Sequence, residues 1–331
     1  MIPAFQVIAD SVDVTSRIAG NLKALRLTDK DGLESDTVEI VITDPEGKTR
    51  LPRRGARLAV SLGWQGERLT PKGVYTVDEV GEDGPPDAIT ILARSADFRA
   101  TLKDQKDQSY HATVLGDVLS ALATRNGLTP AIHADLAGRV IAHLDQTNES
   151  DINLVTRLGE DYGALTAIKA GRLIFVPKAL GLAASGLLLP SFAIARAEGD
   201  RHSFRAADRE GTQTGVKAKW HNLASGMTET ALAGEEGSVK TLKKIYPNRI
   251  EAQAAADAAM KRVKGKRHDF NVTLAKARPE IVAGARISLS GYRSEITDMM
   301  WVASTVTHEL GDGGFTTSIE ASEYLGDEGE D

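Results

Sequence analysis

Two segments far apart in this chain of 331 residues carry the same short pattern. The first starts with Gly55-Ala56-Arg57 and the second with Gly284-Ala285-Arg286, and in both the next residues alternate between apolar and polar side chains. Such alternation is typical of a β-strand with one buried face, because successive side chains of a strand point to opposite sides. A proline stands shortly before each segment, at Pro52 and Pro279.

The residues that follow the two segments also correspond. Tyr75 lies 20 residues after the glycine of the first segment, and Trp301 lies 17 residues after the glycine of the second. The next strand patterns begin at Ile89 and at Thr317, which are 34 and 33 residues after the same two glycines. One pair of similar amphipathic strands would carry little weight, whereas three consecutive strands at nearly equal spacing predict an internal duplication.

The central part of the chain changes to a helical pattern. Apolar residues repeat every three or four positions after Thr113, which we expect to cap a helix that closes at Asn126-Gly127. A second helix is expected to be capped by Ser150 and to end at Gly163, with a short strand over 173–176 after it. From about residue 192 the strand pattern returns, interrupted by an alanine-rich helix over 251–263 and followed by three final strands.

These patterns predict a mainly β fold with an α+β insertion, in which two antiparallel β-barrels flank a small mixed α/β domain. The expected boundaries are 1–100 for the first barrel domain, 101–190 for the mixed α/β domain, 191–325 for the second barrel domain and 326–331 for an acidic tail. A chain of this length is expected to form more than one core, because single cores rarely grow beyond about 250–300 residues.

Composition excludes several classes of function. The chain contains no cysteine, so it has no disulfide framework, thiolate nucleophile or cysteine metal site, and this fits a reducing cytoplasm. The net charge of −6 offers no general attraction for nucleic acid. The N-terminus lacks the basic and apolar regions of a secretion signal. The uncharged stretch 179–195 is interrupted by glycine, serine and proline, so we expect a buried linker and strand there rather than a membrane span.

Acidic and histidine residues are the candidates for sites of chemistry. His143 and Asp145 could offer two metal ligands, but no third partner can be named. Asp145, Glu149 and Asp151 cluster beside a helix start, where carboxylates favour the helix dipole, and this structural role is preferred over acid–base catalysis.

Three further patterns also favour structural roles. Glu160 and Asp161 are adjacent on a helix and point in different directions. His308 is expected on a sheet face or an interface, and Gly311–Gly314 is expected to form a hairpin turn rather than a nucleotide loop. Neither a phosphate-binding glycine loop nor a serine nucleophile motif is present, so we predict no catalytic, cofactor-binding or metal-binding residues and no enzymatic activity.

One segment is too specific to be explained by amphipathicity. Residues 145–151 read DQTNESD, followed by RL at 157–158 and YG at 162–163. This run resembles the late control D proteins of contractile-tailed phages, which are related to the hub part of the VgrG spike proteins of type VI secretion. Further pieces agree in the same order along most of the chain: Ser95–Phe98, Trp220 with Asn222, Gly284–Arg286, Trp301–His308 and Gly314-Phe315.

The resemblance implies a structural baseplate hub of a contractile phage tail or related injection device. Such a hub is a homotrimer at the virion tail tip, assembled in the bacterial host cytoplasm, in which two barrels similar to the tube subunit adapt a six-fold tail tube to a three-fold central spike. The implied partners are the central spike protein, the tail tube or a tube-initiator protein, and other baseplate proteins such as the tape measure protein. No cofactor is implied. Because the chain stops at 331, whereas VgrG chains continue into a spike, the spike is expected to be a separate protein.

In this family the DQTNESD segment has no catalytic role. We therefore expect it to stabilise a helix start, with Ser150 as the cap and with Asp145 or Gln146 bonded to nearby backbone. The alternative function is a peptidoglycan-degrading tail enzyme, suggested only by the scattered acids. A third hypothesis, transcriptional control through DNA, lacks a basic stripe or a recognition helix.

Overall fold

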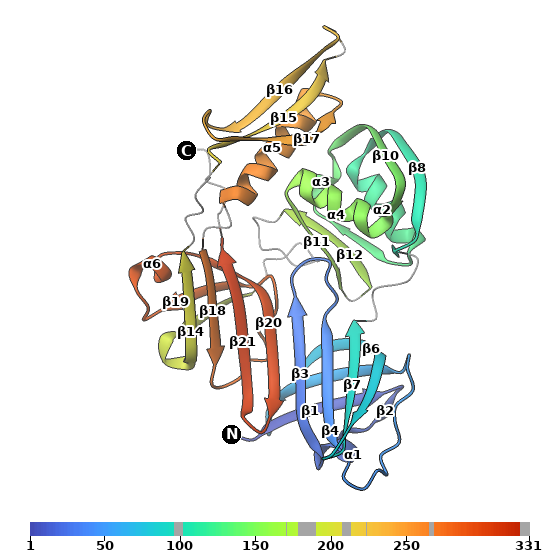
Figure 1. Cartoon of the computed structure of the whole chain (residues 1–331), viewed down its shortest axis with the longest axis vertical. Coiled ribbons are helices and arrows are strands. Elements are labelled where there is room, and N and C mark those ends of the chain that lie inside the picture. The colour runs from blue at the N-terminus through green and yellow to red at the C-terminus, as the bar shows by residue number, and fades with distance from the viewer. Residues whose placement is uncertain are drawn as a thin grey trace. The chain divides into compact units, whose positions relative to one another are not determined.

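The computed structural model describes residues 1–95, 102–169, 171–177, 190–206, 213–222, 224–264 and 268–324. The chain forms two compact units, and each is built from segments that are distant in the sequence (Figure 1). Unit 1 comprises Met1–Phe98, Pro190–Phe204 and Phe270–Ala321. Unit 2 comprises Arg99–Leu189, Arg205–Asp269 and Ser322–Asp331.

Unit 1 contains two halves. The elements of its first half are β1 (Pro3–Ala9), β2 (Val12–Asp13), α1 (Thr15–Ala19), β3 (Leu22–Lys30), β4 (Thr37–Thr43), β5 (Arg57–Trp64), β6 (Thr70–Asp83) and β7 (Ala88–Ser95). Its second half contains β13 (Ser191–Ala195), the 3₁₀ helix η3 (Arg196–Glu198), β14 (Gly199–Ala206), β18 (His268–Leu274), β19 (Arg286–Ser290), α6 (Ser294–Thr297), β20 (Trp301–Gly311) and β21 (Gly314–Glu323).

The two halves have the same order of hydrogen-bonded strands. The order is β3-β4-β7-β6-β5-β1 in the first half and β14-β18-β21-β20-β19-β13 in the second. Apart from the two-residue strand β2, each strand of one half therefore has a counterpart in the other, in the same chain order, and the predicted duplication is confirmed at the level of topology. One pairing differs, because β1 runs antiparallel to β5 whereas β13 runs parallel to β19.

The repeated glycine segments form the same turn. Gly55 N–H donates to the carbonyl of Val77 at 2.8 Å, and Gly284 N–H donates to that of Ala303 at 2.7 Å. The return bonds also match, from Val77 N–H to Ala56 and from Ala303 N–H to Ala285. Both glycines lie in the left-handed region, with φ of 83° and 84°. A side chain is disfavoured there, which explains why glycine opens both segments.

The strand registers after the two turns agree as well. Leu58 pairs with Tyr75, and Ile287 pairs with Trp301 at the corresponding positions. Both aromatic side chains are almost completely buried. Tyr75 contributes to a core with Val38, Ile40 and Ile42, while Trp301 packs in a separate core with Phe270 and Val272. Each half of unit 1 therefore has a core of its own, and Ala277 and Phe315 of the second half also pack into the core of the first.

The two halves are joined into one sheet of thirteen strands. The junction is the antiparallel pairing of β3 with β20, from Lys30 opposite Thr305 to Ala24 opposite Gly311. We call this pairing the seam. The sequence predicted two barrel domains and did not predict that their strands pair with each other.

Unit 2 contains the mixed α/β part of the chain. Its first elements are β8 (Gln105–Val114), α2 (Leu115–Arg125), β9 (Thr129–Ile132), α3 (Ala134–Ala137), β10 (Val140–Ser150), α4 (Asp151–Tyr162), β11 (Ala164–Lys169) and β12 (Arg172–Pro177). Strands β8 and β10 form a two-stranded ribbon, and β11, β12 and β9 form a small sheet. The strand predicted over 173–176 is confirmed.

The helix caps were predicted with mixed success. Ser150 accepts a hydrogen bond from the backbone N–H of Asn153 at 3.3 Å, and Gly163 ends α4 with a left-handed φ of 63°. Asn126 and Gly127 close α2 as predicted. The predicted N-cap Thr113 is wrong, because α2 starts one residue later and Val114 occupies the cap position without a side-chain bond.

Unit 2 also receives part of the segment expected to form the second barrel. Residues 205–269 of the expected span 191–325 group with unit 2. They include β15 (Gly215–Asn222), β16 (Met227–Gly234), β17 (Val239–Tyr246) and the alanine-rich helix α5 (Arg249–Lys264), whose existence is confirmed. Helix α5 lies on the sheet β16-β15-β17 (Figure 1), and its small side chains allow close packing against Val216, Ala218 and Ala231.

Some predicted features lie outside the described residues. These are the acidic tail 326–331, most of Ser95–Phe98 and the larger part of the uncharged stretch 179–195, of which 191–195 forms β13. Among the helices that the structure describes, none has the length and apolar character to cross a bilayer.

The matching turns lead to a stability prediction. Gly55→Ala and Gly284→Ala should each lower the free energy of unfolding by about 1–2 kcal/mol, because alanine pays the cost of a left-handed backbone. Gly20→Ala is the control, since Gly20 has φ of −72° and open space at its Cβ position. Urea unfolding followed by tryptophan fluorescence measures the three changes. An equal loss for the Gly20→Ala control would contradict the left-handed cost, and unequal losses for Gly55→Ala and Gly284→Ala would contradict the equivalence of the turns.

Candidate functional site: a buried carboxylate network and the seam

The DQTNESD segment leads from β10 into α4 and ends at Asp151, whose side chain is fully buried. The carboxylate accepts hydrogen bonds from Lys106 Nζ at 2.7 Å, Asn126 Nδ2 at 2.7 Å, Arg125 Nε at 2.8 Å and Gln146 Nε2 at 2.8 Å. Burial raises the pKa of Asp151, but these bonds outweigh it and hold the pKa below its usual value. A charged acid in this position ties β8, α2, β10 and α4 together.

The other polar residues of the segment serve the same turn. Gln146 also donates to the carbonyl of Glu149 at 2.9 Å, which confirms its predicted bond to nearby backbone. Between these two residues the register with β8 shifts, and Asn148 adopts a left-handed φ of 47°. The backbone N–H of Asn148 donates to the carboxylate of Asp107 at 2.7 Å. The motif therefore specifies a bulged strand end and the helix start after it.

The acids considered for hydrolysis are held by basic partners. Glu149 makes a two-pronged ion pair with Arg157, with Nε–Oε1 of 3.0 Å and Nη2–Oε2 of 2.6 Å. The bond to Glu149 raises the pKa of Arg157. Asp151 and Glu149 are therefore both engaged by basic side chains of the same unit.

His143 and Asp145 lie next to each other on the exposed face of the β8–β10 ribbon. Asp145 bonds His143 Nε2 at 2.8 Å and Ser109 Oγ at 2.6 Å, and these side-chain bonds lower its pKa. His143 Nδ1 lies 3.0 Å from Nδ1 of His111. Among the described residues, no group of three or more histidines and acids is arranged to hold a metal ion.

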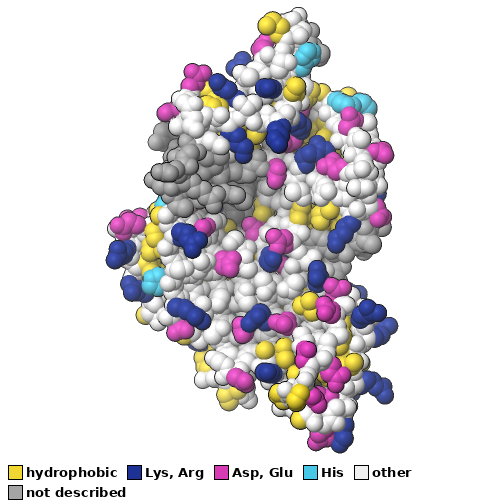
Figure 2. Space-filling model, viewed as in Figure 1, with side chains coloured by type: hydrophobic (Ala, Val, Ile, Leu, Met, Phe, Trp, Pro, Cys, Tyr) yellow, Lys and Arg dark blue, Asp and Glu magenta, His cyan; other side chains and the backbone are white. Residues whose placement is uncertain are grey.

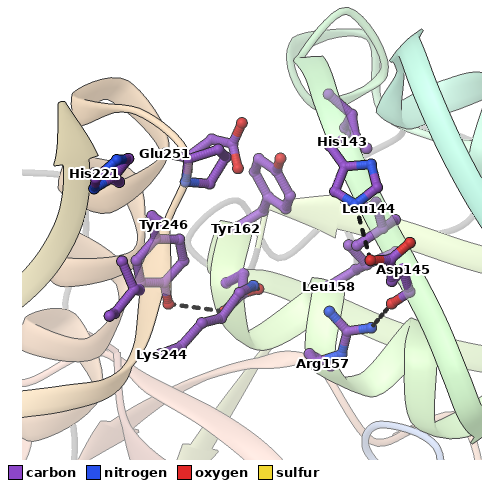
Figure 3. A pocket seen from close by; sticks show the side chains of 14 residues that line it. His143, Leu144, Asp145, Arg157, Leu158, Tyr162, His221, Lys244, Tyr246 and Glu251 are labelled. Atoms are coloured by element: carbon purple, nitrogen blue, oxygen red, sulfur yellow. Dashed lines mark hydrogen bonds and ion pairs between the residues drawn. The ribbon is translucent and has the colours of Figure 1, made fainter. Parts of the chain in front are cut away.

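A cavity of about 400 Å³ lies beside these residues, between α4 and the β17–α5 segment of unit 2 (Figure 3). Asp161 forms part of its wall and accepts bonds from Lys244 Nζ at 2.6 Å and from Tyr246 Oη at 3.2 Å. Glu251, on the α5 side of the cavity, bonds Asn248 at 2.9 Å at the start of α5, and burial raises its pKa. These contacts join two segments of unit 2 and present no nucleophile beside a base.

The seam in unit 1 combines backbone pairing with a few polar side chains. On its exposed side Arg26 bonds Glu309 at 3.1 Å, and the hydroxyls of Thr28 and Thr307 lie 3.5 Å apart. On its buried side Asp29 accepts a bond from the backbone N–H of Ala283 at 2.9 Å. The seam therefore links β3 to both β20 and the turn before β19.

His308 of β20 is fully buried behind the seam, on the sheet face that the sequence predicted. Its Nδ1 accepts from the hydroxyl of Thr317 at 2.9 Å, and its Nε2 donates to the carbonyl of Ile281 at 3.2 Å, so this network assigns the neutral ring. Burial, with repulsion from Lys72, lowers the pKa of His308 to about 3.

The surface shows no single basic stripe on the face that Figure 2 presents. Lysine and arginine side chains are interspersed there with aspartate and glutamate.

Comparison with known proteins assigns this duplicated sheet to a class, the proteins of phage tails. Residues 32–314 match the family described as phage tail baseplate hub (GPD), and the chain belongs to that family. It is 36% identical over 365 residues to the probable baseplate hub protein of Escherichia phage P2, a match that covers 98% of this chain and 94% of the relative. The resemblance seen in DQTNESD and the later motifs is thereby confirmed.

Solved structures share the fold at much lower identity. The 43 kDa tail protein of prophage MuSo2 from Shewanella oneidensis superposes with a TM-score of 0.69 at 14% identity, over 96% of this chain and 98% of that chain. A chain of the half-lidded Francisella PdpA–VgrG complex has a TM-score of 0.57 at 8% identity, over 99% of this chain and 59% of that chain. The predicted relation to VgrG thus holds at the level of the fold.

Sequence reasoning found the motif but missed most of its partners. Lys106, Arg125 and Asn126 come from β8 and the end of α2, and no pattern linked them to Asp151. The placement of Arg125 and Asn126 in the last turn of a helix was the one available signal, because the end of that helix had been predicted.

The Asp151 network gives a mutational prediction. Asp151→Ala should destabilise unit 2 by up to about 3–5 kcal/mol, because it leaves the charges of Lys106 and Arg125 uncompensated near the core. The exposed Asp145→Asn is the matched control and should lower the free energy of unfolding much less than Asp151→Ala does. Urea unfolding of the two variants provides the measurement. A loss for Asp151→Ala no larger than that of the control would refute the network's structural role.

His308 gives a prediction for pH dependence. Its pKa is depressed in the folded chain, so its contribution to stability is complete above the unfolded value of about 6.5 and is lost as the pH falls toward 3. Within that window the wild type should lose up to about 1.4 kcal/mol per pH unit more than His308→Gln. Denaturant midpoints of both proteins at pH 7 and pH 4 measure the difference. Parallel pH profiles would show that His308 does not carry this effect.

Proposed function

We propose that this hub protein is a trimeric adaptor that joins a six-fold tail tube to a three-fold central spike at the tail tip. The observation that carries the proposal is the identical strand order of the two halves of unit 1. Three copies of a chain with two equivalent halves provide six similar units around a three-fold axis, which is the match that a tube and a spike of different symmetry require. In this role each half acts as a tube-like barrel.

The partners follow from this geometry. The six similar units face the tail tube or a tube-initiator protein, and the three-fold side receives a separate central spike protein. Other baseplate proteins such as the tape measure protein complete the surroundings of a hub that is assembled in the host cytoplasm. The role needs no catalytic group, and the engaged carboxylates of Glu149 and Asp151 support a non-enzymatic function.

The proposal is tested by native mass spectrometry of the full chain mixed with the purified central spike protein. We expect a complex that contains three copies of this chain. A single copy, or a failure to bind either the spike or the tube protein, contradicts the adaptor role. The isolated chain is measured as the reference, because a hub that trimerises only on assembly would be monomeric when alone.

A hydrolysis assay addresses the alternative of a wall-degrading enzyme. The wild-type chain should release no soluble fragments from purified peptidoglycan. Release that Glu149→Gln or Asp145→Asn abolishes would instead establish catalysis and overturn the purely structural assignment.

A further inference from the structure

The seam occupies only one of two equivalent places in unit 1. In the second half, the start of β20 pairs with β19 at Trp301 and Val302, and the same strand then pairs with β3 from Thr305 onward. In the first half, β6 pairs with β5 up to Thr76. The following residues of β6, 79–83, pair with β7 on their other edge, and in the described registers no strand takes the place that β3 has beside β20.

Strand β14, the counterpart of β3, lies at one end of the sheet. Strand β14 pairs with β18 as β3 pairs with β4, and the hydrogen-bonded path of the described sheet begins at β14. Six strands lie between β14 and β6 along that path, namely β18, β21, β20, β3, β4 and β7. The two edges therefore cannot pair within one chain while the sheet keeps this order, but they can pair between copies.

The residues of β6 that take part in the expected register follow from β20, the counterpart of β6. Tyr75 and Trp301 hold equivalent positions, as do Val77 and Ala303, so β6 and β20 correspond with a constant offset. Continuing this offset to the end of β6 makes Asp83 the equivalent of Glu309. Both positions carry an acid.

The residues of β14 that take part in the register follow from β18, the neighbour of β14. Thr273 bonds Ser318 of β21 at 3.0 Å, a cross-strand pair equivalent to Val41 and Thr90. The residues of β18 then correspond to those of β4, with Asn271 in the place of Glu39. Asn271 bonds Ser203 of β14 at 3.3 Å, as Glu39 lies opposite Arg26.

Ser203 therefore occupies the place of Arg26, and Asp83 occupies the place of its seam partner Glu309. Arg201 and Arg205 flank Ser203 on the same face of β14, and all three residues are exposed. The end of β6 is acidic, with Glu79, Glu82 and Asp83 exposed. Long arginine side chains reach diagonal cross-strand neighbours, so the two edges are complementary in charge as well as in position.

We propose that residues 79–83 of β6 in one copy pair antiparallel with β14 of the next copy, with Asp83 opposite Ser203 and between Arg201 and Arg205. This second seam repeats between chains the seam that β3 and β20 form within a chain. The proposal rests on the trimeric function above and assigns its contact surface: three internal and three intermolecular seams close one ring.

Engineered cysteines test the contact, because the natural chain contains none. The full-length Asp83→Cys/Ser203→Cys variant, assembled with the purified spike protein and mildly oxidised, should form disulfides between chains, and the linked species should end at three chains. The matched control is Arg26→Cys/Glu309→Cys, which places cysteines at the equivalent pair of the internal seam and should close within one chain. Absence of interchain disulfides under conditions that close the control overturns the proposal, and so does a ladder that continues beyond three.

A charge reversal adds an independent measurement. In the Asp83→Cys/Ser203→Cys background, Arg205→Glu should lower the cross-linked fraction about two- to five-fold through repulsion from the acidic end of β6. Arg50→Glu, at an exposed position on neither strand, should leave the fraction unchanged. Equal effects of the two substitutions overturn the proposed register.

The mass of the complex with the spike separates the two proposals. A trimeric complex whose Asp83→Cys/Ser203→Cys form gives no interchain disulfide overturns the second seam and leaves the adaptor role intact. A complex with a single copy of the chain refutes the adaptor role itself.

Discussion

The pairing of β3 with β20 is the contact on which unit 1 depends. A strand edge left open exposes unpaired backbone groups, and β20 satisfies one edge with two partners in succession, β19 and then β3. The backbone bonds carry this junction, since the ion pair of Arg26 with Glu309 is about half exposed and such pairs contribute about 0–1 kcal/mol. Asp29 adds specificity, because its buried carboxylate bonds the backbone of Ala283 in the turn that starts the second repeat.

Local patterns were enough to predict the repeat, but they could not predict the seam. The glycines that open the repeated segments, the Ser150 cap and the alternation of Val38, Ile40 and Ile42 are short-range signals that survive in any packing. The partners in the seam, Arg26 and Glu309, are 283 residues apart, and both strands alternate like any half-buried strand. The same limit applies to residues 205–269, because strand and helix patterns do not reveal the unit against which they pack. The N-cap predicted at Thr113 is one residue before the observed cap position, and errors of this size are usual at helix ends.

The hydrogen-bond and ion-pair partners of the acids show what the candidate site does. Asp145, Glu149 and Asp151 look like a catalytic cluster in the sequence, yet Asp151 is bonded on all sides and Glu149 is paired with Arg157. A buried charge of this kind adds little net stability over an apolar group, but losing one partner costs much, so it selects a single arrangement of the elements that meet there. That requirement explains why a run of polar residues as specific as DQTNESD belongs to a structural protein. The polar side chains of this segment hold a strand end, a bulge and a helix start in place.

The internal seam leaves two strand edges, the acidic end of β6 and the basic strand β14. Their opposite charges decide which edges can pair. Two β6 ends would bring Glu79, Glu82 and Asp83 against their own copies, and two β14 strands would do the same with Arg201 and Arg205, so like edges repel. Only unlike edges attract, so the proposed contact between copies is head-to-tail. A head-to-tail contact forms a closed ring when its rotation divides the circle and an open filament when it does not. Because the internal seam already sets the angle between two equivalent halves, a second seam of the same geometry repeats that angle, and the closure of the ring depends on the twist of this one pair of strands.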